Sequence, residues 1–370
     1  MLCVGALAAC AIRPAPPGGI RVVTAPAPSD EERFCAWYGH AAGPILYFGQ
    51  SGFWAAFRAS GGRPEADLDR AGPALIGRFD LAGERLLPSI DVAPPPGEAD
   101  RSGVWDVFAH ANGRIYFTTF FGLAGSVDPA TGAVERFPGA GRGLNEIAAG
   151  PDGNLIVSRY GSTDGGNGSL VVLRPDGGVV SEYPLAAPAG LVAAPKTIAY
   201  DPTHDEFWLT TDMIPSGDRP DAAMRHDTVV LDRNGREISR FESPEVQFVA
   251  FDAGGTGYRA EVTGAELTLH IVPPRGAERR IPLDRGFATG VDFVQDIQFS
   301  DDGRVTIARW SGWVHVADPD DSIRSVRLPV LEPPGLYYTA VTVGERLCAT
   351  HCGDVTVVCE DLESGRGSGG

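Results

Sequence analysis

The sequence predicts an all-β protein: a seven-bladed β-propeller whose ring is closed by an N-terminal strand that completes the last blade. Three observations lead to this fold class. A strand–turn–strand pattern recurs along the chain, a second hairpin follows most of its copies, and a lone strand precedes the first copy while the last copy lacks one. Short strands at a regular period, separated by turn residues, are typical of propeller blades.

Seven segments share the first pattern, in which alternating apolar residues lead into a turn and then into a β-rich run. Most of them start 40 to 52 residues apart, and only the first gap is longer. The segments cover Cys35 to Gly52, Val104 to Gly122, Leu144 to Gly161, Lys196 to Asp212, Val246 to Gly264, Val294 to Gly312 and Tyr338 to Asp354.

The second hairpin carries the residues that tight turns demand, such as Thr131-Gly132, Asp176-Gly177 and Asn234-Gly235. Its clearest copies cover Ala74 to Ile90, Gly125 to Gly139, Leu170 to Leu185 and Thr228 to Glu242. The two hairpins together give four strands per repeat. One four-stranded sheet cannot cover both of its faces, whereas a closed ring of such sheets buries them.

The last repeat offers only three strands, one starting at 338 and two over 345–350 and 355–360. We expect the strand-like segment from Gly19 to Pro26 to supply the missing outermost strand, because this pairing removes two exposed sheet edges. The propeller domain is therefore predicted to cover residues 20–362, followed by a flexible tail over 363–370.

A recognisable motif runs through the second and third repeats. It reads NGRIYFTTFFGLAGSVDPATGAVERFPG over 112–139 and DGNLIVSRYG over 152–161, followed by GSLVVLRPDGGVVSEYPL over 168–185. These residues resemble the streptogramin lyases, the virginiamycin B lyase type of seven-bladed propeller. More distantly, the arrangement is similar to the gluconolactonase-like and NHL-repeat propellers. The motif is structural, so the resemblance implies a fold rather than an activity.

Streptogramin lyases use a His at the start of an inner strand and a Glu just after the second strand of the same blade. Glu261 matches the Glu position, but Gln247 stands where the His is expected. None of the inner-strand starts that the repeats define carries a His. The resemblance is therefore weaker for the lyase chemistry than for the fold, and Glu261 is a candidate catalytic residue by position alone.

The overall charge excludes one class of partner. The formal net charge is −17, and no run of basic residues stands out. Nucleic-acid binding needs a basic surface, so we expect no nucleic-acid partner. Hydrophobic residues make up 43% of the chain, enough to bury a large core. We expect a monomer that binds a small-molecule ligand or a protein of the cell envelope.

The first ten residues, MLCVGALAAC, point to the bacterial cell envelope. Leu7-Ala8-Ala9-Cys10 resembles the lipobox of lipoproteins, in which the cysteine is lipidated and becomes the mature N-terminus. The segment 1–10 is too short to span a bilayer, so the lipid on Cys10 would be the membrane contact. Because Ala11 follows where an Asp would favour the inner membrane, the resemblance implies an outer-membrane lipoprotein facing the periplasm or the cell surface. The alternative is a chance apolar start. Residues 11–19, rich in Pro and Gly, are predicted to form a tether.

Four further cysteines predict disulfides, because the envelope is an oxidising compartment. Cys348 and Cys359 would face each other across a hairpin over 346–360. Cys352 could then join Cys35 and clip the two ends of the domain together. The alternative is four free buried thiols, and the spacing fits no common zinc pattern.

The starts of the inner strands converge on one mouth of the central channel in a propeller. Three of them carry an acid here, namely Asp106, Glu146 and Asp296, and the side-chain amides beside them are Asn145, Gln247 and Gln295. Such groups suit Ca²⁺ or another divalent cation, and gluconolactonase-like propellers hold their metal in a similar way. A metal here could polarise an ester carbonyl and activate water. The alternative is that these side chains bond neighbouring backbone groups or ordered water.

Two arginines stand beside an aromatic residue where a second strand ends: Arg159 next to Tyr160, and Arg309 next to Trp310. This combination suits an anionic or sugar-like ligand, unless each arginine pairs with nearby acids. His351 could act as a general base near neutral pH. The alternative is that His351 is an exposed residue of a short turn.

Two functions therefore remain open for the channel mouth. In the first, the protein is an envelope-anchored module that binds a ligand or a protein partner there. In the second, it is a metal-dependent hydrolase or lyase, lactonase-like or streptogramin-lyase-like, that acts at the same mouth. A bound metal and a titrating acid or base would favour the second.

Overall fold

The computed structural model describes residues 11–12, 20–24, 35–52, 74–93, 103–119, 122–161, 166–217, 219, 222–242, 246–263, 266–284, 292–320, 322–331, 336–352 and 355–362. The predicted signal segment 1–10, most of the predicted tether and the predicted tail 363–370 lie outside these residues. Within the described part of the chain, no helix is long and apolar enough to cross a membrane.

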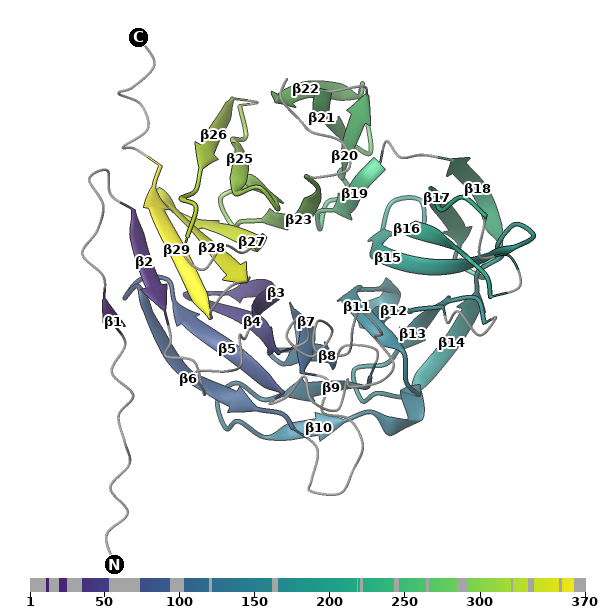
Figure 1. Cartoon of the computed structure of the whole chain (residues 1–370), viewed down its shortest axis with the longest axis horizontal. Coiled ribbons are helices and arrows are strands. Elements are labelled where there is room, and N and C mark those ends of the chain that lie inside the picture. The colour runs from purple at the N-terminus through teal and green to yellow at the C-terminus, as the bar shows by residue number, and fades with distance from the viewer. Residues whose placement is uncertain are drawn as a thin grey trace, which may run out of the picture.

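The strands form five four-stranded sheets and one nine-stranded sheet, and the blades are arranged around a centre (Figure 1). The nine-stranded sheet holds β1 (Ala11–Ile12) and two further blades of four strands each, which are joined where Cys352 pairs with Cys35. Blade 1 holds β3 (Cys35–Ala42), β4 (Ile45–Ser51), β5 (Leu75–Asp80) and β6 (Arg85–Asp91). Blade 2 holds β7 (Val104–Ala109), β8 (Ile115–Thr119), β9 (Ala124–Val127) and β10 (Val134–Arg136), and blade 3 holds β11 (Leu144–Ala149), β12 (Leu155–Arg159), β13 (Ser169–Leu173) and β14 (Val179–Pro184). Blade 4 holds β15 (Leu191–Asp201), β16 (Glu206–Pro215), β17 (Arg225–Asp232) and β18 (Glu237–Glu242).

The remaining blades follow the same order. Blade 5 holds β19 (Val246–Phe251), β20 (Gly257–Thr263), β21 (Glu266–Val272) and β22 (Arg279–Asp284), and blade 6 holds β23 (Val294–Phe299), β24 (Val305–Arg309), β25 (Trp313–Ala317) and β26 (Ile323–Arg327). Blade 7 holds β27 (Leu336–Val343), β28 (Arg346–Cys352), β29 (Thr356–Asp361) and the N-terminal β2 (Arg21–Thr24). All strand pairs within the blades are antiparallel. The prediction of an all-β, seven-bladed propeller is confirmed.

The ring closes as the sequence predicts. β2 pairs antiparallel with β29, and Arg21 lies opposite Cys359 while Thr24 lies opposite Thr356. Val23 packs into the apolar layer between blades 7 and 1. A short strand β1 (Ala11–Ile12), at the start of the predicted tether, pairs with the outer side of β2.

Two disulfides strengthen this seam. Cys35 of β3 bonds Cys352 of β28, which joins blade 1 to blade 7. Cys348 and Cys359 link β28 to β29 within blade 7. Both pairings are the predicted ones, so the alternative of free buried thiols is wrong.

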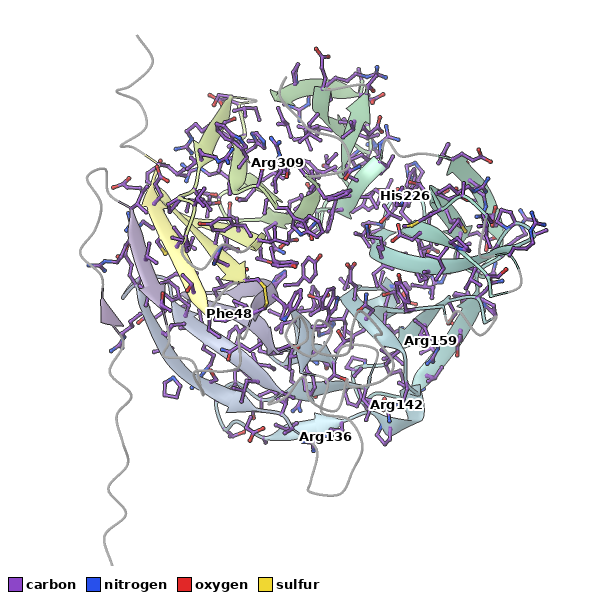
Figure 2. The ribbon with its side chains drawn as sticks, in the orientation of Figure 1. Phe48, Arg136, Arg142, Arg159, His226 and Arg309 are labelled. Atoms are coloured by element: carbon purple, nitrogen blue, oxygen red, sulfur yellow. A yellow bond between two sulfur atoms is a disulfide. The ribbon has the colours of Figure 1, made fainter. Side chains whose placement is uncertain are left out.

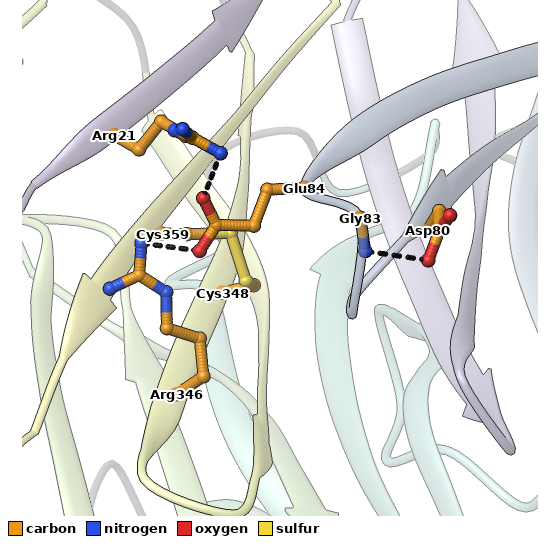
Figure 3. Close-up of a disulfide and its surroundings, with 7 residues drawn as sticks. All are labelled: Arg21, Asp80, Gly83, Glu84, Arg346, Cys348 and Cys359. Carbon is orange, nitrogen blue, oxygen red and sulfur yellow. Dashed lines mark hydrogen bonds and ion pairs between the residues drawn. A yellow bond between two sulfur atoms is a disulfide. The ribbon is translucent and has the colours of Figure 1, made fainter.

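An ion pair also crosses the seam next to the second disulfide (Figure 3). Glu84 lies in the turn between β5 and β6, and its carboxylate contacts Arg21 of β2 and Arg346 of β28. Asp80 shapes this turn by accepting a hydrogen bond from the amide of Gly83, at 2.9 Å. A single carboxylate of blade 1 thus contacts two strands of blade 7.

The core consists of apolar layers between adjacent blades. Clusters of buried residues join blades 1 and 2, 2 and 3, 3 and 4, 5 and 6, 6 and 7, and 7 and 1. In the described residues no cluster of this kind joins blades 4 and 5. That interface includes a ring contact between Trp208 of β16 and Phe251 of β19, with centroids 6.1 Å apart.

Candidate site at the mouth of the ring

Every inner strand carries a β-bulge, which lies near the start of the strand except in β15, where it lies in the middle. The register between the first and second strands shifts at one equivalent place in all seven blades. Two consecutive residues of the inner strand there lie opposite one residue of the second strand, which is how a bulge redirects side chains. The pairs are Trp37-Tyr38, Trp105-Asp106, Asn145-Glu146, Lys196-Thr197, Gln247-Phe248, Gln295-Asp296 and Tyr338-Thr339. We call this set of pairs the mouth.

The mouth brings four aromatic rings together from blades 7, 1 and 2. The ring centroid of Trp37 lies 4.5 Å from that of Trp105 and 4.8 Å from that of Tyr338. Tyr38 lies 5.3 Å from both Trp105 and Tyr338. Its hydroxyl donates a hydrogen bond of 2.7 Å to Oε1 of Gln295, so blades 1 and 6 also meet here.

The three acids predicted from the sequence, Asp106, Glu146 and Asp296, belong to these same bulges. Burial raises the pKa of Asp106 to about 6 and that of Asp296 to about 7, and the charge of Asp106 adds to the effect on Asp296. The pKa of Glu146 is raised well above its usual value by burial and then by the charges of Asp106 and Asp296, against the opposing charge of Lys196. Three carboxyl groups are therefore held where ionisation is costly.

Backbone hydrogen bonds fix these carboxyl groups. Asp106 accepts one from the amide of Val107 at 2.7 Å and one from the amide of Ile147 in the next blade at 2.9 Å. Glu146 accepts one from the amide of Ile198, again in the next blade. The sequence left open that these side chains bond neighbouring backbone groups, and Asp106 and Glu146 do so. These bonds hold the two side chains in place.

The three acids do not form a metal-binding group among the residues that the structure describes. Among the described residues, no group of three or more His, Cys, Asp and Glu side chains is placed to hold a metal ion. Both carboxylate oxygens of Asp106 already accept an amide, and Gln298 donates to both oxygens of Asp296 at 3.0 and 2.9 Å. We therefore derive no chemical step through a metal. A divalent cation at Asp106, Glu146 and Asp296 stays a prediction.

The two predicted arginine–aromatic pairs lie in separate blades, as Figure 2 shows for Arg159 and Arg309. Arg159 forms an ion pair with Glu182, with Nε and Oε1 2.8 Å apart, and Arg309 is buried against Asp292. Trp310 packs edge-on against Phe293. Arg159 thus pairs with an acid of its own blade, and Arg309 pairs with an acid of the segment before β23. Their role in ligand binding stays a prediction.

The two candidate catalytic residues lie outside the group of three acids. Glu261 contacts Arg259 and His270, with Oε2 3.2 Å from Nε2 of His270. His351 is buried against the ring of Tyr337 rather than exposed in a turn. Their catalytic roles stay predictions.

Sequence reasoning missed several residues at or beside the mouth. Trp37-Tyr38 fills the bulge of blade 1, where the repeat is too degenerate for the alignment of strand starts to be read. Lys196 lies 3.8 Å from Oδ1 of Asp212, which in turn lies 2.5 Å from Nδ1 of His226. The signal for Lys196 was its place in the repeat. His226 lies on a third strand and gave no such signal.

Comparison with known proteins supports the architecture. No protein-family model matches the chain, and no characterised protein matches it in sequence. The solved structure of a catalytically inactive virginiamycin B lyase from Staphylococcus aureus, with quinupristin, superposes with a TM-score of 0.55 and 11% sequence identity, and the match covers 92% of this chain and 98% of that one. This chain has the propeller fold of that lyase. At this identity the likeness extends to the fold alone.

Proposed function

We propose that this protein is an envelope-anchored propeller whose mouth binds a small-molecule ligand or an exposed part of an envelope protein. The observation that carries the proposal is the convergence of four aromatic rings and three carboxyl groups on one set of bulges. Tyr38, Trp105, Asp106 and Glu146 keep part of their surface exposed there. Aromatic surface with a few fixed polar groups is the usual composition of a binding site.

Stability alone does not account for this composition. Burial disfavours the ionised forms of Asp106, Glu146 and Asp296, so placing these side chains there costs the native state free energy. The inner strands need only hydrogen-bond acceptors at these positions, and Thr339 supplies one to the amide of Gly39 at 3.0 Å with an uncharged side chain. Perturbed acids gathered on a partly exposed surface favour a functional role.

A second candidate is catalysis beside the mouth, and one contact favours it. Nδ1 of His226 lies 2.5 Å from the largely buried carboxylate of Asp212, and the His226 side chain keeps 42% of its surface exposed. An acid that orients an accessible imidazole is an arrangement that general-base catalysis uses. Loss of turnover with retained ligand binding in His226→Gln would support this candidate.

The binding proposal is tested by screening a small-molecule fragment set against the full chain by ligand-observed NMR. We expect hits that Trp105→Ala removes and Trp313→Ala retains, because Trp313 lies at the start of β25, away from the bulges. Thermal unfolding of both variants checks that they fold. The absence of hits, or hits that survive Trp105→Ala, would contradict the proposal.

A further inference from the structure

The aromatic cluster offers a surface that attracts cations. Trp37 and Tyr338 are fully buried, whereas Trp105 and Tyr38 contact them and stay partly exposed. The face of a Trp or Tyr ring carries negative charge density, and its attraction for a cation strengthens where water is excluded. A positively charged group that enters the mouth would meet these two rings first.

The formal charges around the cluster are negative. The charges of Glu146, Asp296 and Asp106 all reach Tyr38, where they add to burial in raising its pKa. The positive charge of Lys196 opposes these negative charges, but its side chain is exposed and also forms an ion pair with Asp212. Burial raises the pKa of all three carboxyl groups, and a cation bound beside them would favour their ionised forms.

An unsatisfied acceptor lies in the same set of bulges. Asn145 is 6% exposed, and its Oδ1 is buried without a hydrogen-bond donor among the residues that the structure describes. In its blade, Asn145 occupies the position that Trp105 holds on one side of it and Lys196 on the other. A buried carbonyl without a donor costs free energy, which an N–H group from a ligand would recover.

We propose that the mouth binds a protonated organic amine, whose ammonium group is attracted by the charges of Asp106, Glu146 and Asp296, lies against the rings of Tyr38 and Trp105 and donates to Oδ1 of Asn145. This inference rests on the proposed function, because it names the ligand class of the same site. Because Oδ1 of Asn145 needs an N–H donor, a primary or secondary ammonium should bind more tightly than a quaternary one, which has no N–H group.

The test compares three small probes of similar size on the full chain by isothermal titration calorimetry: butylammonium, butan-1-ol and tetramethylammonium. We expect butylammonium to bind at least about tenfold more tightly than the other two, because only it brings both charge and N–H donors. Glu146→Gln, which keeps the shape of the side chain, should lower its affinity by about tenfold or more. Asp301→Asn removes the same charge from an exposed turn of blade 6 and should leave the affinity unchanged.

The outcomes separate the inference from the proposed function. If butylammonium and butan-1-ol bind equally and Trp105→Ala removes both, the mouth binds ligands but the ammonium inference is overturned. If butylammonium binds equally well to Glu146→Gln and Trp105→Ala, the acidic surface attracts it elsewhere and the inference is again overturned. If no probe binds and the fragment screen is also empty, both the inference and the proposed function fail.

Discussion

At the scale of single residues, the bulges leave backbone amides that need partners, and small hydroxyl residues opposite them supply these. The amide of Glu146 donates to Oγ of Ser158 at 2.9 Å, and the amide of Thr339 donates to Oγ1 of Thr350 at 3.1 Å. These hydroxyl groups are buried and satisfy donors that would otherwise be unpaired. The bulge in the first strand therefore depends on hydroxyl residues of the second strand of the hairpin.

The acids of the mouth give the molecule a defined pH dependence. Burial raises the pKa of Asp296 from 3.8 to about 7, so the native state holds its proton after the unfolded chain has released it. Stability from this group is thus full below pH 4 and is lost as the pH rises through about 7. We expect Asp296→Asn to gain stability relative to the native chain between pH 4 and pH 8, by up to about 4 kcal/mol.

Urea unfolding at several pH values measures this effect. Asp301→Asn serves as the control, since its carboxyl group is exposed. A difference between Asp296→Asn and the native chain that stays constant from pH 4 to pH 8 would contradict the assigned shift.

At the scale of elements, the seam between blades 7 and 1 combines β2, Glu84 and two disulfides. The disulfides close very different lengths of chain: Cys35 and Cys352 are 317 residues apart, and Cys348 and Cys359 are 11 apart. In the chain-entropy account, the longer loop restricts the unfolded chain more, by 1.5RT ln(317/11), or about 3 kcal/mol.

We therefore expect the double variant Cys35→Ser with Cys352→Ser to lose more stability than Cys348→Ser with Cys359→Ser. Denaturant unfolding of both double variants and of the native chain measures the two losses. Equal losses would show that native contacts around the cysteines, rather than loop closure, determine their contribution.

At the scale of the whole molecule, the ring has one interface that differs from the others. Blades 4 and 5 share no cluster of buried apolar residues in the described chain, while Phe241 beside this interface is 45% exposed. Fewer buried apolar contacts mean a lower free energy of local opening.

We expect amide hydrogen exchange to be faster in peptides that cover β18 and β19 than in peptides that cover β2 and β29. Exchange measured by mass spectrometry on the native, oxidised protein provides the comparison. Equal protection at the two places would contradict an early opening between blades 4 and 5.

The location of the whole molecule depends on Cys10, which we propose carries a lipid. The oxidised state of the four domain cysteines supports an envelope location. We expect Cys10→Ser to move the protein from the membrane fraction to the soluble fraction and to remove the mass of the lipid. Cys3→Ser is the matched control and should leave both unchanged.

The sequence by itself determined the blades, the closing strand and both disulfides. The blades and the Cys348–Cys359 pair depend on short-range signals: the alternation of apolar residues, turn residues such as Asp176-Gly177, and two cysteines on one hairpin. The closing strand and the Cys35–Cys352 pair followed from the repeat count, because the last repeat lacked one strand and two cysteines remained. A strand's two-residue period and a turn's backbone geometry are local properties, so one chain segment is enough to read them. The positions of Asp106, Glu146 and Asp296 at strand starts followed from the same repeat.

Only the tertiary structure decided what surrounds those acids. Tyr38 reaches Gln295 across 257 positions of sequence, and Trp37 packs on Tyr338 because ring closure makes blades 1 and 7 neighbours. The bonding of Asp106 to the amide of Ile147 likewise depends on how one blade sits against the next. Burial, charge coupling and the free acceptor of Asn145 arise from packing between blades, and no periodic pattern within one segment encodes such contacts.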